Sequence, residues 1–184
     1  MKSRITESTL LFISVVKWVA LASGAGAVVG AATAVFLGLL HAATGAAGGF
    51  PYYWLLLPAA LFASSLLTWY FARDARGHGT EKVIEAVHKR SGRIPLKVVP
   101  VKLLATIITL ACGGSAGKEG PCAQIGAGLT SAISGLLRFN DRDRRKLVIC
   151  GISAGFAAVF GTPIAGAIFG VEVLFVGAIM YEVL

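Results

Sequence analysis

One acidic residue, Glu119, lies in a glycine-rich break between two strongly apolar segments. Residues 113–121 read Gly-Gly-Ser-Ala-Gly-Lys-Glu-Gly-Pro. A carboxylate at membrane depth is costly, so an acid in this position indicates a site where charged species pass. Pro121 suits the first turn of a helix, where its missing N–H is no loss, and the free N–H groups of a helix start attract anions. The segment therefore predicts a helix start inside a membrane, facing an anion.

A tethered carboxylate competes with an anion for such a helix start, which carries about half a positive charge. When Glu119 is protonated, it loses this attraction and can swing out, so that an external anion enters. The backbone amides of Gly120 to Ala123 are the expected anion donors, and Lys118 is expected to steer anions by its charge. Two alternatives stay open: Glu119 is a structural acid paired with Lys118 or another cation, and Lys118 is a lysine that snorkels to the interface.

The composition is that of an integral membrane protein with several crossings. Of the 184 residues, 56% are hydrophobic and 14% are charged, and the mean hydropathy is +0.78. A soluble domain carries about 25% charged residues. The net charge of +8 is gathered in short polar stretches beside apolar segments. This distribution indicates positive-inside topology and contact with anionic headgroups of a lipid bilayer, and it argues against nucleic acid as a partner.

Apolar runs separated by Gly, Pro and charged turns predict an all-helical membrane fold, in one transmembrane domain over residues 1–184. The expected helical segments are residues 10–41, 51–72, 80–89, 98–112 and 121–137, then, after a charged turn at 140–145, a helix that runs to about residue 160, and the segment after the break at 161–163. Residues 44–50 are expected to form a loop, and Asp141 or Asp143 is expected to cap the following helix. Apolar helices broken by Gly and Pro at membrane depth are typical of transporters and channels.

The basic residues predict the orientation. Lysines and arginines gather near the N-terminus, in residues 73–97 and in residues 138–146. By the positive-inside rule, all three stretches are cytoplasmic, and the chain is a multi-pass protein of the plasma (inner) membrane. The residues between the second and third stretches then cross an even number of times, as broken helices can.

No feature of the sequence indicates an enzyme, and no metal or cofactor is expected. The glycine-rich run fails as a phosphate-binding loop, because Cys112 stands where GxxxxGK[ST] needs its first Gly and Glu119 where it needs Ser or Thr. The three cysteines lie in apolar segments without CxxC spacing and are expected to be small buried hydrophobes.

Two motifs resemble a known family. Gly117-Lys118-Glu119-Gly120-Pro121, followed by Gln124-Ile125-Gly126, is similar to the signature of the CLC chloride channels and chloride/proton exchangers. The run from Ala154 to Phe169, with Gly161-Thr162-Pro163 at its centre, resembles the next helix pair of that family. The resemblance covers most of the chain and is weaker over the first 70 residues.

The resemblance implies one half of a pore. In that family, two inverted halves form one subunit with its own pore, and two subunits form a homodimer. This chain resembles the first, N-terminal half and is expected to be a fragment or part of a longer protein. Glu119 matches the gating glutamate, and chloride or another halide is the expected ligand. The expected anion-binding residues are His78, Gly79, Gly117, Lys118, Gly120, Pro121, Cys122 and Ala123.

The second anion-facing motif of the family departs from its usual form here. The family reads Gly-Ser-Gly-Ile-Pro, and the matching residues 77–81 read Gly-His-Gly-Thr-Glu. His78 replaces the serine whose hydroxyl contacts the central anion, although a histidine N–H can also donate to an anion. Glu81 would repel an anion if it faced the pore. Relatives that change this serine include fluoride/proton exchangers, and the other interpretation of His78 is an ordinary interfacial histidine.

The inner proton-transfer position also departs from the exchanger pattern. Exchangers carry a glutamate ten residues after the proline that matches Pro163, and that place is Val173 here, directly after Glu172. A valine at this position resembles the channel branch of the family and removes the inner proton acceptor. Glu172 and Val173 are the positions of a possible proton path, in which protons would reach Glu119 through Glu172 or water. The sequence leaves three hypotheses open: a chloride-conducting channel or exchanger, which we favour, a fluoride/proton exchanger, and a membrane scaffold half that conducts nothing.

Overall fold

The structure is a computed structural model that describes residues 2–182, with side chains at Thr9 and at residues 11–173. Within these residues every regular element is a helix. In chain order they are α1 (Lys2–Gly48), η1 (Tyr53–Leu56), α2 (Leu57–Phe71), η2 (Arg73–Ala75), α3 (Thr80–Lys89), α4 (Val98–Ala111), α5 (Glu119–Leu136), α6 (Asp141–Phe160) and α7 (Pro163–Glu182). The all-helical fold class predicted from the sequence is confirmed.

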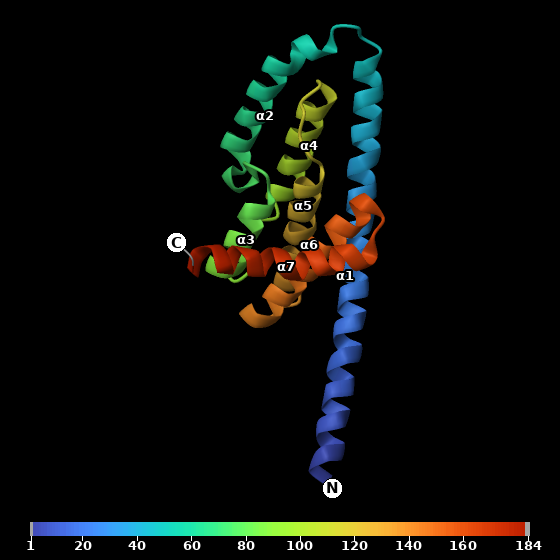
Figure 1. Cartoon of the computed structure of the whole chain (residues 1–184), viewed down its shortest axis with the longest axis vertical. Helices are drawn as coiled ribbons and strands as arrows, with labels where there is room; N and C mark the ends of the chain where they lie inside the picture. The colour runs from blue at the N-terminus through green and yellow to red at the C-terminus, as the bar shows by residue number, and fades with distance from the viewer. Residues whose placement is uncertain (1, 183–184) are drawn as a thin grey trace.

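The helices are arranged around α5 (Figure 1). Helix α1 runs along the whole molecule, and its N-terminal part extends past the other helices. Helices α1, α3, α4 and α6 all pack against α5, α2 packs against α4, and α7 lies across the end of this group against α6. With 47 residues, α1 is about 70 Å long at ~1.5 Å per residue, more than twice the thickness of a bilayer core.

The core follows from the small residues of α5. All residues from Pro121 to Gly128 are buried. One side of α5 contributes Ala123 and Ala127 to a cluster with residues of α3, α4 and α6, and another contributes Cys122 and Ile125 to a cluster with Phe36 of α1. Short side chains let helices approach closely without a loss of packing, as is common in membrane proteins.

Helices α5 and α6 pack at glycines. A Cβ at Gly126 would collide with the Gly151 carbonyl oxygen, and a Cβ at Gly151 would lie 2.6 Å from the Gly126 carbonyl oxygen. A Cβ at Gly155 would collide with the carbonyl oxygen of Cys122. The two backbones are therefore in direct contact over more than one turn, and this contact fixes α5 relative to the rest of the fold.

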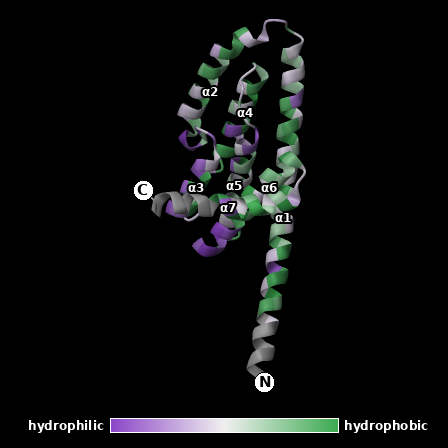
Figure 2. Cartoon of the chain, viewed as in Figure 1, coloured by the Kyte–Doolittle hydropathy of each residue, from purple (hydrophilic) through white to green (hydrophobic). Residues whose placement is uncertain are grey.

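The outer surface of the first two helices is apolar. Residues 11–48 and 53–71 form helices long and apolar enough, by length and composition, to cross a membrane. Phe62 is 71% exposed and Tyr70 is 77% exposed on α2. Figure 2 shows hydrophobic residues along α1 and α2, and hydrophilic residues gathered where α3 and the start of α6 lie. This pattern is that of a protein whose sides face lipid or further helices and whose end faces water.

Most predicted helix positions are confirmed. Thr80–Lys89 forms α3 with the predicted bounds, Val98–Ala111 forms α4, and the break before Pro163 lies at Gly161, which adopts a left-handed φ of 67°. The left-handed residue ends α6, because its N–H bonds back to the Ala157 carbonyl oxygen at 2.8 Å.

Two local predictions are wrong. Residues 44–48 continue α1 and do not form a loop, because the Thr44 hydroxyl donates to the Leu40 and His41 carbonyl oxygens within the helix and several neighbours are alanines, which favour helix. The cap of α6 is Asn140 rather than Asp141 or Asp143, since its side-chain oxygen accepts from the Asp143 N–H at 2.8 Å.

Substitution of Gly126 by Ala is expected to lower the thermal stability of the full-length protein in detergent. The new methyl group must push α5 and α6 apart against backbone atoms, at a cost of about 1–3 kcal/mol. The matched control is Gly135→Ala in the same helix, where a Cβ meets no atom within 4 Å and the change should leave stability equal or slightly higher. Equal melting temperatures for the two variants would contradict the close contact.

Candidate anion site between two helix starts

Two helix N-termini meet in the centre of the structure. Gly79 caps the start of α3 with a φ of 97°, a conformation that side chains disfavour. A Cβ at Gly79 would lie 2.8 Å from the Gly120 carbonyl oxygen, and a Cβ at Gly120 would collide with the carbonyl oxygen of His78. Both positions therefore need glycine for the two segments of the backbone to touch. The positive ends of α3 and α5 consequently converge on one region.

A cavity of about 900 Å³ opens at this junction. Its walls come from α2, the loop before α3, α4 and the glycine-rich segment before α5. Glu119 lines the cavity at the start of α5, and its carboxyl group lies against Gly117, where a Cβ would collide with it. Among the residues with described side chains, no cation lies within ion-pair distance of Glu119. The ion pair with Lys118 considered as an alternative is not formed in this structure.

A buried lysine holds the loop that precedes α3. Lys102 of α4 is 6% exposed, and its ammonium group donates to the carbonyl oxygens of Gly77 at 2.6 Å and Ala75 at 3.2 Å. Lys102 also lines the cavity. A buried charge needs polar partners, and these two carbonyl groups supply them. The lysine thus fixes the loop and adds a positive charge to the cavity wall.

Gln124 fixes the same loop from the side of α5. Its Nε2 donates to the Asp74 carbonyl oxygen at 2.7 Å, and its Oε1 is buried beside Gly79 without a hydrogen-bond partner in the described structure. This glutamine belongs to the motif that resembles the CLC signature. The loop before α3 is therefore attached to α4 through Lys102 and to α5 through Gln124.

The charges around the cavity are of both signs. Arg76, Lys102 and His78 line it, and so do Glu81 and Glu119. The Arg76 guanidinium lies 5.0 Å from the centre of the Trp69 ring, a cation–π distance. The two helix starts add partial positive charge. The cavity can therefore hold a small anion against Lys102 and the helix starts, and the two carboxylates can compete for the same charges.

The predicted anion-binding residues separate into two groups. Those that line the cavity, beside Glu119, are His78, Gly117, Gly120 and Pro121, whereas Gly79, Lys118, Cys122 and Ala123 do not line it. The side chains of Cys122 and Ala123 are packed in the core.

The amide donors available at the start of α5 are fewer than predicted. The Cys122 N–H donates to the Lys118 carbonyl oxygen at 3.1 Å, the Ala123 N–H is used within the helix, and Pro121 has no N–H. The unpaired donors at the start of α5 are therefore the N–H groups of Glu119 and Gly120. The N–H groups of Cys122 and Ala123 are therefore not free to face an anion, contrary to the prediction from the sequence.

The candidate proton path lies away from the cavity. Glu172 on α7 is exposed, and Val173 packs against the core cluster that includes α3 and α6 residues. Neither residue lines the cavity. Within the described part of the chain, no three His, Cys, Asp or Glu side chains are grouped so as to hold a metal ion.

Sequence reasoning missed Lys102. The sequence does contain a signal for this residue, because Lys102 lies inside the apolar run 98–112. A charged side chain at membrane depth is costly, and the same argument identifies Glu119. Its partners are two carbonyl groups about 25 residues earlier in the chain, and no local pattern indicates such a contact.

Comparison with known proteins places the chain in a family. The family described as "Voltage gated chloride channel" matches residues 59–184. These residues include the helix starts, the glycine-rich segment and Glu119. The class defined by the fold and the site is thus an all-helical protein with two helices apolar enough to cross a membrane and a cavity where two helix starts meet. The chain belongs to the voltage-gated chloride channel (CLC) family, which confirms the resemblance seen in the sequence.

Three relatives show the range of the similarity. The chain is 38% identical over 183 residues to a protein of Pseudomonas syringae pv. tomato named "Chloride/fluoride channel protein", covering 100% of this chain and 40% of the relative. It is 30% identical over 165 residues to an uncharacterized protein of Methanocaldococcus jannaschii, covering 89% of this chain and 39% of that protein. It is 33% identical over 120 residues to the "H(+)/Cl(-) exchange transporter ClcA" of Vibrio vulnificus, covering 64% of this chain and 26% of the transporter. The chain therefore spans less than half the length of these relatives.

Replacement of Lys102 by Met is expected to weaken chloride binding to the purified full-length protein at least tenfold. At an effective dielectric constant of about 20, a unit charge in the cavity wall contributes on the order of 1–4 kcal/mol to the binding of an anion in the cavity. Lys97→Met is the matched control, because Lys97 is exposed, precedes the same helix and does not line the cavity. Calorimetric titration with chloride gives the affinities, and equal affinities in the two variants would exclude Lys102 from anion attraction.

Proposed function

We propose that this chain forms the N-terminal half of a pore that carries chloride or a similar small anion across a membrane, with Glu119 as its gate. The observation that carries this proposal is the position of Glu119. Its carboxyl group lies unpaired at the cavity where the starts of α3 and α5 meet. Membership of the family and the names of two relatives, a chloride/fluoride channel protein and an H(+)/Cl(-) exchange transporter, support anion transport.

The gate follows from competition between two negative groups. An ionised Glu119 sits beside the unpaired N–H groups at its own helix start, where an anion is also attracted. Protonation removes the charge of Glu119 and with it the advantage over a mobile anion. The flexible side chain lies against Gly117, which has no side chain to hold it there. Acidification then opens the site to external anions.

The arrangement of the basic stretches supports the proposed orientation. Arg93 and Asp141 form an ion pair at 3.1 Å, so the stretches 73–97 and 138–146 lie at the same end of the molecule. Trp18 of α1 contacts Phe139, so the N-terminal part of α1 extends past this same end. Helices α4 and α5 lead away from this end and back to it, as an even number of passes requires. We assign this end to the cytoplasmic side of the plasma (inner) membrane by the positive-inside rule.

The second half of the pore lies in further residues of the same subunit, and a second complete subunit forms the dimer. The apolar outer faces of α1 and α2 offer surfaces for lipid and for a second, inverted half. A homodimer of complete subunits, each with its own pore, is the assembly that the family resemblance implies.

Fluoride is the second candidate substrate, and two observations favour it. The relative that matches 100% of this chain is named a chloride/fluoride channel protein. His78 lines the cavity in place of the serine of chloride-carrying relatives, and it brings a nitrogen donor to the anion. An imidazole N–H can donate a hydrogen bond to a small anion such as fluoride.

Replacement of Glu119 by Gln is expected to abolish the pH dependence of anion flux in liposomes that contain the full-length protein. The amide cannot ionise and so cannot compete with an anion for the helix start. Glu85→Gln is the matched control, because Glu85 lies on α3, pairs with Lys82 at 3.1 Å and does not line the cavity. Flux and pH dependence equal to wild type in Glu119→Gln would remove Glu119 as the gate, and no flux from the wild-type protein would favour a non-conducting scaffold.

Replacement of His78 by Ser is expected to lower the ratio of fluoride to chloride flux several-fold. The hydroxyl group restores the donor of chloride-carrying relatives and removes the group that can carry a positive charge. His88→Ser is the control, since His88 is exposed near the other end of α3, where its Nδ1 contacts the Ile84 carbonyl oxygen. Ion-selective electrodes measure both fluxes from the same liposomes. An unchanged ratio in His78→Ser would exclude His78 as the residue that selects the anion.

A further inference from the structure

A second polar site lies at the opposite end of α5. It is a hollow of about 670 Å³ whose wall includes Arg90, Arg93, Arg144, Ser131, Ile94 and Pro95. Gly135, which also lines it, follows Glu119 by sixteen residues, or about 24 Å along a helix at ~1.5 Å per residue. The hollow is therefore separate from the cavity beside Glu119, and the proposed anion transport makes no use of it.

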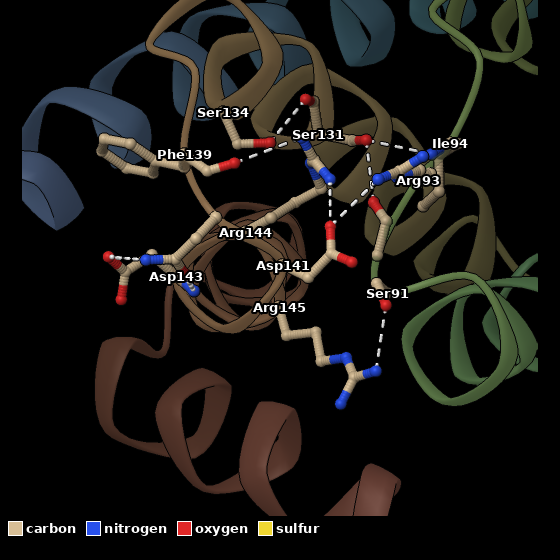
Figure 3. A network of polar contacts seen from close by, with 12 residues as sticks. Ser91, Arg93, Ile94, Ser131, Ser134, Phe139, Asp141, Asp143, Arg144 and Arg145 are labelled. Carbon is tan, nitrogen blue, oxygen red and sulfur yellow. Dashed lines mark hydrogen bonds and ion pairs between the residues drawn. The ribbon is translucent and has the colours of Figure 1, made fainter.

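The arginines of the hollow have too few acidic partners. The Arg93 and Arg144 guanidinium groups both donate to the same oxygen of Asp141, at 3.1 Å and 2.8 Å. Arg90 pairs with Asp74 at 3.0 Å, and Asp143 lies 4.0 Å from Lys146. Arg145 reaches a neutral partner, the Ser91 hydroxyl, at 3.0 Å. Figure 3 shows Asp141 between Arg93 and Arg144, with Arg145 directed toward Ser91. The group keeps a net positive charge.

The geometry of this group is fixed by buried contacts. The Ser131 hydroxyl donates to the Gly92 carbonyl oxygen at 2.8 Å and accepts from the Ile94 N–H at 2.9 Å, which holds the loop that carries Arg93. Arg144 is only 14% exposed and also donates to the Phe139 carbonyl oxygen at 3.3 Å. Arg144 is therefore held in place and loses little freedom when it binds a ligand, whereas the backbone that carries the exposed Arg93 side chain is fixed by Ser131.

Asp141 does not line the hollow itself, but its carboxylate bridges Arg93 and Arg144, two of the arginines that do. Its side chain is 53% exposed, and the Arg93 guanidinium beside it holds the pKa of the Asp141 carboxyl below its usual range. The carboxylate is therefore charged at neutral pH and bridges the two arginines. Because it is half exposed and lies in the first turn of α6, it can turn outward when a more highly charged group arrives.

The surroundings of the hollow are those of a membrane surface. Trp18 and Phe139 contact each other beside it, with the Lys146 ammonium 5.0 Å from the centre of the Trp18 ring. Leu136 and Leu137, at the end of α5, are exposed. Tryptophan and lysine beside exposed apolar side chains are typical of the level of lipid headgroups.

We propose that the hollow formed by Arg90, Arg93 and Arg144 binds a phosphate group. Phosphate oxygens match the planar, forked donors of arginine, and a phosphate replaces the Asp141 carboxylate between Arg93 and Arg144. Two sources share this chemistry: the headgroup of an anionic phospholipid and a soluble phosphate. The site is independent of the anion that the pore carries.

Binding to the purified full-length protein tests this proposal. One arm measures retention of phosphatidylglycerol against phosphatidylcholine by native mass spectrometry, and the other titrates inorganic phosphate calorimetrically. We expect Arg93→Gln and Arg144→Gln each to weaken binding at least tenfold. Arg142→Gln is the matched control, because it removes the same charge from the same turn but does not line the hollow, and it should stay within about twofold of wild type.

The two arms identify the source. If the protein binds phosphatidylglycerol but does not bind inorganic phosphate, the site is assigned to lipid headgroups. If it binds inorganic phosphate, the site is assigned to soluble phosphates. Binding of neither, or equal weakening by Arg142→Gln, overturns the proposal.

Asp141→Asn supplies a test that does not depend on removing an arginine. If a phosphate replaces the carboxylate, the loss of this competitor should tighten phosphate binding several-fold. A thermal unfolding transition first confirms that the variant is folded. Unchanged or weaker phosphate binding in this folded variant also overturns the proposal.

Discussion

The contact between the starts of α3 and α5 is the constraint on which the rest of the structure depends. Gly120 lies against the carbonyl group of His78, and Gly79 lies against that of Gly120, at a distance that no Cβ allows. The contact brings two helix starts to one point, although electrostatics alone would push their positive ends apart. Negative groups must then be supplied nearby, and the unpaired carboxylate of Glu119 is one. A mobile anion is a natural second.

The helices around α5 serve to hold this unfavourable arrangement. Glycines of α5 and α6 let the two backbones touch, and the loop before α3 is fixed through Gln124 and Lys102. Lys102 adds a third positive element to the cavity wall, which strengthens the need for a negative partner. Two of its three N–H donors are occupied by the carbonyl groups of Ala75 and Gly77, which leaves its charge and one donor for an anion.

Much of the fold and part of the site follow from the sequence, for physical reasons that differ between elements. The bounds of α3 follow from helical apolar spacing between glycine and basic residues, and the break before Pro163 follows from Gly161. The continuation of α1 through residues 44–48 does not follow from their glycine-rich composition, because the neighbouring alanines and the hydrogen bonds of the Thr44 hydroxyl favour helix there. The position of Glu119 beside a helix start was predictable from a single motif. The contact of Gly120 with the His78 carbonyl group, and the role of Lys102, depend on distant segments that no local pattern encodes.

The two ends of α5 carry opposite partial charges, and this difference accounts for the two polar sites. At its start, unpaired N–H groups favour a carboxylate or an anion. At its end, the helix dipole is negative, and cations are favoured there. Arg144 donates to the Phe139 carbonyl oxygen just beyond this end, and the Arg93 loop is fixed to Ser131 in the last turns of the helix. The arginines that gather there exceed what half a negative charge and Asp141 can balance, so the excess is left to attract a phosphate. One buried helix thus positions a site for a small anion at its start and a basic site at its end.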